Sequence, residues 1–269
     1  MVRNHVENMV PKNTTRWLSY GSWTWEVLRR NPDYISYFKS LKNKGLETHL
    51  IGENIPLIVA SQGYPTAKKS GLLFPVDPDL DAGMGQPFWH PDVLKSMVRF
   101  HVIPQHEIDR RDKPIQLSKF SAQQTHFLDA NGTYHIRLLG QNFWFQMQCD
   151  NLSQINENAY IGFENNRVGN LEKRLKTLTQ IYGVYDGSIP LDSRLHLPAN
   201  LTSHQKSMIA YDIQANGGSL TDIVSAFIEA NLIVENPDEF KDFSYDAKNA
   251  LTRARAFIYG DYLKILGKQ

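Results

Sequence analysis

Residues 125–147, THFLDANGTYHIRLLGQNFWFQM, decide the fold of the first half of the chain. Two strand-like runs, 125–128 and 133–139, flank a turn that contains Asn131-Gly132, the strongest short signal for a β-hairpin, because both residues tolerate a positive φ. A third strand-like run follows at 142–147. The stretch therefore predicts a small antiparallel β-sheet.

Upstream of this sheet, residues 17–45 predict two helices that are separated at Asn31-Pro32. Proline disfavours helical backbone in the residue before it, yet it suits the first turn of a new helix. Asn31 is therefore the expected N-cap, and Asp33 lies in the first turn, where a carboxylate interacts favourably with the positive helix end. The aromatic residues of this segment are expected to form a packed core, and a partner-binding face is the alternative.

Composition indicates a folded chain of 269 residues, with 41% hydrophobic and 21% charged residues. The single cysteine, Cys149, cannot form an internal disulfide or a four-thiolate metal site, which favours a reducing compartment. No apolar run resembles a secretory signal or reaches the roughly 18 residues of a membrane span. We therefore expect a cytoplasmic protein without a membrane partner.

The second half of the chain is predicted to be helical. A polar, asparagine-rich stretch is the candidate linker at 151–170, between an N-terminal domain at 1–150 and a C-terminal domain at 171–269. Helices are expected at 171–182, 202–216, 220–230 with Ser219 as the cap, and 244–266 with Ser244 as the cap. The predicted class is α+β, with N-terminal helices and a small sheet followed by an all-helical domain that resembles a helix-turn-helix unit.

The last predicted helix separates an apolar face from a polar face at 100° per residue. The polar face carries side chains that suit DNA phosphates and base edges. These candidate DNA-binding residues are Lys248, Asn249, Thr252, Arg255 and Tyr259, with Arg253 on the flank. A solvated amphipathic helix is the alternative, and the 12-residue separation at 231–242 is longer than the three- or four-residue turn of a compact helix-turn-helix.

Sequence motifs give little support to catalysis. The chain has no His-Glu-x-x-His, Walker loop, Gly-x-Ser-x-Gly or paired carboxylate cluster. His101 and His106 are five residues apart across Pro104, which matches neither one helix face nor a zinc spacing. We therefore predict no catalytic residue, no metal site and no cofactor, while an enzyme that uses the His101–His135 region remains a third hypothesis.

Three segments carry a resemblance to RovC-like bacterial transcriptional regulators. Residues 25–34, WEVLRRNPDY, resemble the signature that opens this family. Residues 71–74 and 77–78, together with 88–94, FWHPDVL, are similar to its next conserved segments. Residues 218–223, GSLTDI, and the stretch 243–263 are similar to its DNA-binding domain.

This resemblance implies a sequence-specific, DNA-binding transcriptional activator, most directly of type VI secretion genes, and a relation to activators of the excision of integrative conjugative elements. It also implies a homo-oligomer such as a hexamer, which binds double-stranded promoter DNA, with RNA polymerase as a further candidate partner. The cations of the last helix are sparser than is usual in the family, so oligomers would raise the affinity through effective concentration. The alternative from another class is a DNA-free antiactivator that sequesters a regulator through the aromatic N-terminal face.

Overall fold

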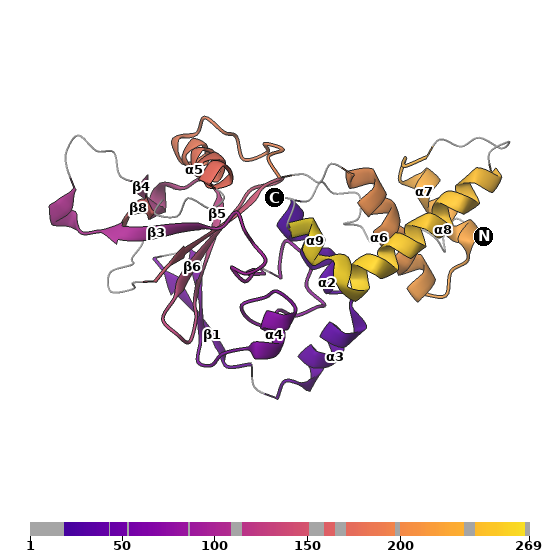
Figure 1. Ribbon diagram of the computed structural model, residues 1–269, viewed down its shortest axis with the longest axis horizontal. Helices are drawn as coiled ribbons and strands as arrows, with labels where there is room; N and C mark the ends of the chain where they lie inside the picture. The colour runs from indigo at the N-terminus through magenta and orange to yellow at the C-terminus, as the bar shows by residue number, and fades with distance from the viewer. Residues whose placement is uncertain are drawn as a thin grey trace.

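The computed structural model describes residues 19–42, 44–52, 54–85, 87–108, 115–150, 159–164, 171–196, 200–233 and 240–266 (Figure 1). Within these ranges the strands are β1 (Leu46–Ile51), β2 (Ile55–Ala60), β3 (Val98–Ile103), β4 (Ile115–Gln116), β5 (Gln123–Leu128), β6 (Tyr134–Leu139), β7 (Trp144–Cys149) and β8 (Tyr160–Glu164). The α-helices are α2 (Tyr20–Leu28), α3 (Pro32–Ser40), α4 (Pro65–Lys69), α5 (Leu171–Asp186), α6 (Leu201–Ala215), α7 (Leu220–Glu229), α8 (Phe240–Ala256) and α9 (Leu263–Leu266).

The chain is thus α+β. A small antiparallel sheet is not confirmed as a separate unit, because the three predicted strands are β5, β6 and β7, an antiparallel part of a larger mixed sheet. All eight strands form one mixed sheet in the order β1-β2-β5-β6-β7-β3-β8-β4. The pairs β2–β5 and β7–β3 are parallel, and the other pairs are antiparallel. The Asn131-Gly132 hairpin is confirmed as the turn between β5 and β6, with Gly132 at φ 84°. Hairpin signals are local, whereas parallel pairs join distant segments that no local motif marks.

Both faces of the sheet are covered, which gives the molecule two cores. One core contains α2, α4 and the segment 72–94 on one face, and the other contains α5 on the opposite face (Figure 1). Cys149 lies in the second core at 2% exposure, as expected of a small buried hydrophobe. Because neither face of the central strands meets water, even polar strand residues become buried.

The break at Asn31-Pro32 is confirmed. The Asn31 side-chain oxygen accepts from the backbone N–H groups of Asp33 (2.8 Å) and Tyr34 (3.0 Å), and Pro32 opens α3. The Asn31 side-chain amide also donates to the carbonyl of Ile258, 227 residues further along the chain. The cap therefore joins the start of α3 to the far end of the C-terminal helices.

Replacing Asn31 with leucine is expected to lower the free energy of unfolding by about 2 kcal/mol, roughly half from the lost cap and half from the lost bond to Ile258. Asn31→Asp keeps the acceptor oxygen of the cap but sets a second carboxylate oxygen against the Ile258 carbonyl, so it should lose at least the half of the stability that comes from the bond to Ile258. Urea unfolding of both variants measures this. Equal stability of Asn31→Leu and the wild type would show that neither bond contributes.

The predicted linker and domain boundary need correction. Within 151–170, β8 is an integral strand that pairs with β3 and β4. The following helix, α5, packs on the sheet through Ile181 and Val184, so it belongs to the N-terminal body rather than to the C-terminal helices. The asparagines of this stretch lie outside the described residues, and β8 itself, YIGFE, is rich in the aromatic and β-branched residues that favour a strand.

Helices α6, α7 and α8 share a third core that includes Ile213, Phe227 and Leu251. Ser219 caps α7 as predicted, in a reciprocal capping box with Asp222. The four-residue turn typical of a helix-turn-helix lies between α6 and α7, at 216–219, where Gly217 has φ 82°. The connection between α7 and α8, at 230–239, is longer than such a turn.

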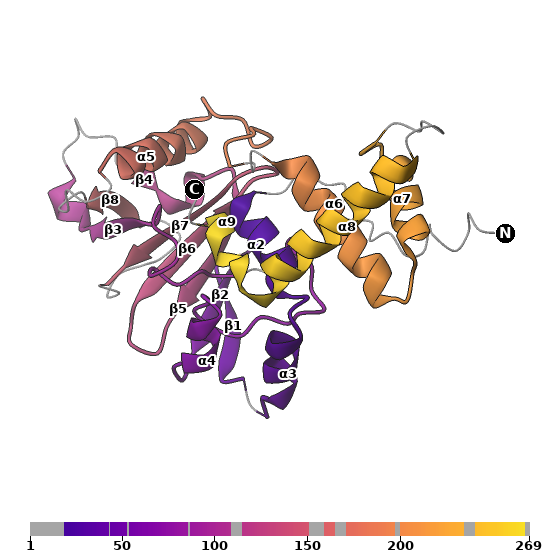
Figure 2. The same ribbon diagram turned by 45° about the vertical axis from the view of Figure 1, so that its right-hand side comes forward.

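The sequence predicted a terminal helix that Ser244 caps and that continues to Leu266. Both parts of this prediction are wrong. The helix begins at Phe240, and a π-helical turn, η4 (Phe257–Asp261), interrupts it. Gly260 has φ 156° and ψ −29° there, a backbone that an L side chain rarely adopts. The chain then turns into α9, whose Ile265 and Leu266 are buried beside α2 in the first core (Figure 2).

Candidate nucleic-acid interface

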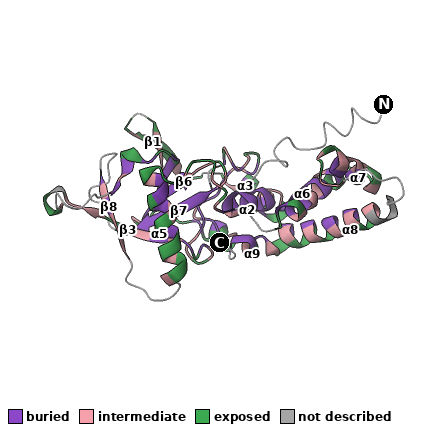
Figure 3. Cartoon of the chain, turned by 90° about the horizontal axis from the view of Figure 1, so that it is seen from above, coloured by how far each residue is buried: buried purple, intermediate pink, exposed green. Residues whose placement is uncertain are grey.

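An exposed stripe runs along the outer side of α8 and into η4 (Figure 3). Its members are exposed side chains at helical spacing: Tyr245, Lys248, Thr252, Arg255 and Tyr259. On a helix with 100° per residue, the first four lie within about 80° of one another. We call this set the α8 stripe. It combines two cations, a hydroxyl and two aromatic rings on one rigid element.

Four of the six predicted residues belong to the α8 stripe, and two do not. Lys248, Thr252, Arg255 and Tyr259 are exposed together, whereas Asn249 and Arg253 are only partly accessible. The Nε of Arg253 is buried and has no hydrogen-bond partner among the described residues. The helical projection placed Asn249 on the polar face and Arg253 on its flank, but packing within the three-helix unit leaves both only partly accessible.

Tyr245 is the stripe residue that the sequence reading missed. Its side chain is 69% exposed, and that of Tyr259 is 61% exposed, so the two rings flank the cations along the helix. A tyrosine ring combines a large apolar surface with a hydroxyl group, which suits it to an interface. The spacing 245-248-252-255-259 could have identified it, but the predicted helix start at Ser244 put Tyr245 in the first turn.

The charges around the α8 stripe leave its cations without carboxylate partners in the described part of the chain. Lys206 pairs with Asp246, Lys264 pairs with Asp261 at 2.7 Å, and Asp212 pairs with Arg30 of the N-terminal body. Arg255 makes a neutral contact, donating to the side-chain oxygen of Gln214 at 2.9 Å. The α8 stripe is therefore a face on which no described carboxylate neutralises the positive charge of Lys248 and Arg255.

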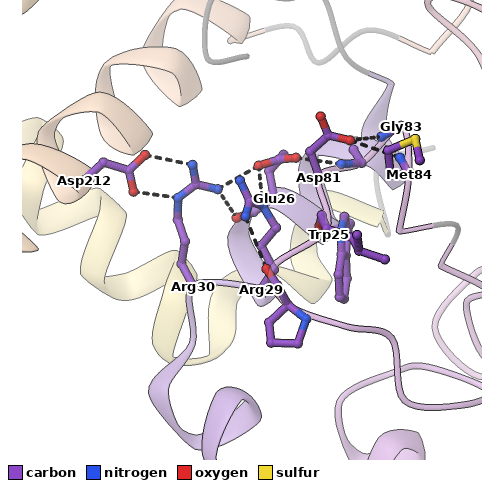
Figure 4. A network of polar contacts seen from close by, with 11 residues as sticks. Trp25, Glu26, Arg29, Arg30, Asp81, Gly83, Met84 and Asp212 are labelled. Atoms are coloured by element: carbon purple, nitrogen blue, oxygen red, sulfur yellow. Dashed lines mark hydrogen bonds and ion pairs between the residues drawn. The ribbon is translucent and has the colours of Figure 1, made fainter. Parts of the chain in front are cut away.

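A buried ionic network connects α6 to the N-terminal body (Figure 4). Arg30 donates through Nε and Nη2 to both carboxylate oxygens of Asp212, each at 2.7 Å, and through Nη1 to Glu26 at 2.8 Å. Arg29 donates to the same Glu26 carboxylate at 2.7 Å. Glu26 also accepts from the backbone N–H of Ala82 at 2.8 Å.

We call this set of Glu26, Arg29, Arg30 and Asp212 the joint network. Residues 25–34 thus serve as the structural joint of the molecule: they carry three members of the network and the cap that reaches Ile258. The joint holds α6 and η4 at fixed positions, and α8 is packed against α6 and continuous with η4. The α8 stripe is therefore presented by a rigid support, as a recognition surface requires.

The histidines of the His101–His135 region do not converge on one site. His101 is exposed on β3, and His106 is exposed beside Glu107. His135 is buried on β6, where its ring stacks on Phe127 with centroids 5.8 Å apart. Burial lowers the pKa of His135 to about 3, so its imidazole is neutral at pH 7. Among the described residues, no three His, Cys, Asp or Glu side chains are grouped so that they could hold a metal ion.

A search for helices that could span a membrane finds none with the necessary length and apolar character in the described ranges. Comparison with known proteins adds no assignment: the sequence matches no model of a protein family and no curated protein.

Proposed function

We propose that the protein binds double-stranded DNA through the α8 stripe. The observation that carries this proposal is the pair of cations, Lys248 and Arg255, exposed on one face of a rigidly held helix and without carboxylate partners among the described residues. Lysine and arginine neutralise phosphates, and arginine also reads guanine in the major groove. The two tyrosines supply hydroxyl donors for the DNA backbone, whereas the Thr252 hydroxyl donates to the Lys248 carbonyl within α8 at 3.0 Å and offers DNA an acceptor oxygen.

Helix α8 suits this role better than α7 does. In a standard helix-turn-helix the second helix after the short turn enters the major groove, which here would be α7. That helix carries Asp222 and Glu229 and no basic residue. Its charge would repel phosphates, so we assign recognition to α8 and support to α6 and α7.

The biological role proposed here is that of a transcriptional activator in the cytoplasm, and the resemblance at 25–34 and 218–223 is its support. Type VI secretion genes are the proposed targets on the same ground. Two stripe cations per chain give weak binding alone, so we propose that a homo-oligomer binds promoter DNA. The antiactivator alternative is less well supported, because the aromatic residues that it would use, such as Trp23 and Trp25, are buried.

The double substitution Lys248→Ala/Arg255→Ala in the full chain tests the proposal. Each lost phosphate contact should reduce the slope of log affinity against log salt by about one, so we expect a reduction of about two and weaker binding to every DNA sequence. Titration of duplexes from the upstream regions of neighbouring genes, at several salt concentrations, measures both quantities.

Lys264→Ala is the matched control. Lys264 is also an exposed cation near the chain's end, but it pairs with Asp261 and lies outside the α8 stripe. It should bind DNA like the wild type. If the double variant is folded and retains both the affinity and the salt slope of the wild type, α8 is not the DNA-binding element.

A further inference from the structure

Strand β1 is an open edge of the eight-stranded sheet. It pairs with β2 on one side, and no strand among the described residues pairs with its other side. Its residues 47–50 are exposed, with Leu50 at 65%. Proteins usually protect such edges with lysine, proline or a bulge. The sequence of β1, LETHLI, has neither lysine nor proline.

The hydrogen-bond pattern shows which backbone groups of β1 face outward. The Ser61 N–H donates to the Gly45 carbonyl at 2.9 Å, so this pair continues the β1–β2 ladder as a hydrogen-bonded pair. In an antiparallel ladder such pairs alternate with pairs that are not bonded to each other. Glu47 and His49 therefore bond to β2. The residues between them direct their N–H and C=O groups away from β2: Leu46, Thr48 and Leu50.

Pro56 agrees with this assignment. It lies opposite Leu50, at a pair where β2 needs no N–H toward β1, and proline has none. The open edge therefore offers three outward N–H groups and three outward C=O groups at alternating residues, which is the pattern that an added antiparallel strand requires.

We propose that β1 is a self-association surface, on which β1 of a second copy of this chain pairs antiparallel about a two-fold axis at Thr48. In this register Thr48 meets Thr48, and Leu46 meets Leu50 of the second copy. Every outward-facing residue then meets another outward-facing residue, so all three alternating pairs can form hydrogen bonds. The interface is isologous, as a two-fold dimer demands.

The side chains select this register. Glu47 falls opposite His49 of the second copy at two symmetric positions, and these pairs belong to the closely spaced, non-hydrogen-bonded class. An axis at residue 47 would place Glu47 opposite Glu47 of the second copy, and an axis at residue 49 would place His49 opposite His49. Either shift sets two identical ionisable side chains against each other. Glu47 and His49 already share one face, with Oε2 and Nε2 3.4 Å apart within the chain.

This surface goes beyond the DNA-binding proposal and does not depend on it. Strand β1 lies in the sheet body and α8 in the helical extension (Figure 2), so the pairing leaves the α8 stripe open. A dimer formed in this way carries two α8 stripes, which raises the effective concentration at DNA. The test below contains no DNA, so its failure is distinct from failure of the DNA proposal.

Sedimentation velocity of the full chain over a range of concentrations tests the inference. The wild type should show a reversible monomer–dimer equilibrium. Thr48→Pro removes the outward N–H from both copies at the axis and removes no bond to β2, so the dissociation constant should rise about 5- to 150-fold. Thr48→Val keeps the N–H and a β-branched side chain, and it should associate like the wild type.

A charge exchange tests the register without proline. Glu47→Lys should weaken association, because it removes the acceptor that faces His49 of the second copy. Glu47→Lys/His49→Glu should restore association, because it places a lysine and a glutamate opposite each other across the axis. The inference is overturned if the wild type is monomeric throughout, if Thr48→Pro associates like the wild type, or if the double variant is no better than Glu47→Lys.

Discussion

The protein is expected to lose stability steeply as the pH falls from about 6.5 to about 4, because three buried histidines must remain neutral in the folded state. Burial lowers the pKa of His126 and His135 to about 3 and that of His196 to about 4, from the ordinary 6.5. In this range the unfolded chain binds protons that the folded chain does not, so acid favours unfolding. Each histidine lowers the free energy of unfolding by up to about 1.4 kcal/mol per pH unit, and the three together lower it by up to about 4 kcal/mol per pH unit.

His135→Phe tests the cause of this acid sensitivity. The ring lies between Phe88 and Phe127, and neither of its nitrogens has a hydrogen-bond partner among the described residues. Phenylalanine should therefore fit at this position. The unfolded variant should take up one proton fewer than the unfolded wild type as the pH falls. Urea unfolding at several pH values between 7 and 4.5 measures the slope. The variant should show a shallower slope and equal or higher stability at pH 5.

His106→Gln is the control for this series, because His106 is exposed and the substitution removes a histidine without changing the buried core. A slope for His135→Phe equal to that of the wild type would show that His135 is protonated in the folded state. In that case the imidazole would have a polar partner that the described contacts do not contain.

Arg30→Ala is expected to lower the free energy of unfolding by about 3–5 kcal/mol, because it leaves the Asp212 and Glu26 carboxylates buried beside a missing cation. The Glu26 side chain is 6% exposed and that of Asp212 is 13% exposed. Burial alone would lower the pKa of Arg30, but the hydrogen bonds and charges of Asp212 and Glu26 raise it above its ordinary value. Urea unfolding with a global fit measures the loss.

The double variant Arg30→Ala/Asp212→Ala separates the charge from the packing. Arg30→Ala leaves the Asp212 carboxylate buried without its cation, and the second substitution removes that carboxylate. The double variant should therefore lose less free energy of unfolding than the sum of the losses of the two single variants. Lys264→Ala, at an exposed ion pair, should change stability by less than about 1 kcal/mol. Additive losses, or a loss for Arg30→Ala as small as that of Lys264→Ala, would show that the joint network contributes little.

The joint network also explains why the two halves of the chain are not independent. The end of α8, η4 and α9 contribute Ala254, Ile258 and Ile265, respectively, to the core that contains α2. A fragment that starts near residue 165 would expose this surface and would lose the partners of Asp212. Division of the chain at a linker therefore does not describe this molecule, although different surfaces of it can still have different roles.

Local chemistry was readable from the sequence alone. The caps at Asn31 and Ser219 and the hairpin at Asn131-Gly132 depend on residues within four positions of one another, and the structure confirms all three. The helical face that presents Lys248, Thr252 and Arg255 is equally local, because a helix repeats every 3.6 residues. The α+β class follows from such signals.

What only the tertiary structure decided depends on contacts between distant segments. The parallel pairs of the sheet, the strand within 151–170 and the α2–α9 packing join residues that are far apart in sequence. Arg137 is the clearest case: alternation along β6 gives it the face opposite Ile136, and a second covering layer buries it completely and lowers its pKa to about 9. Periodicity determines which side a residue faces, but only the assembled layers determine whether that side meets water.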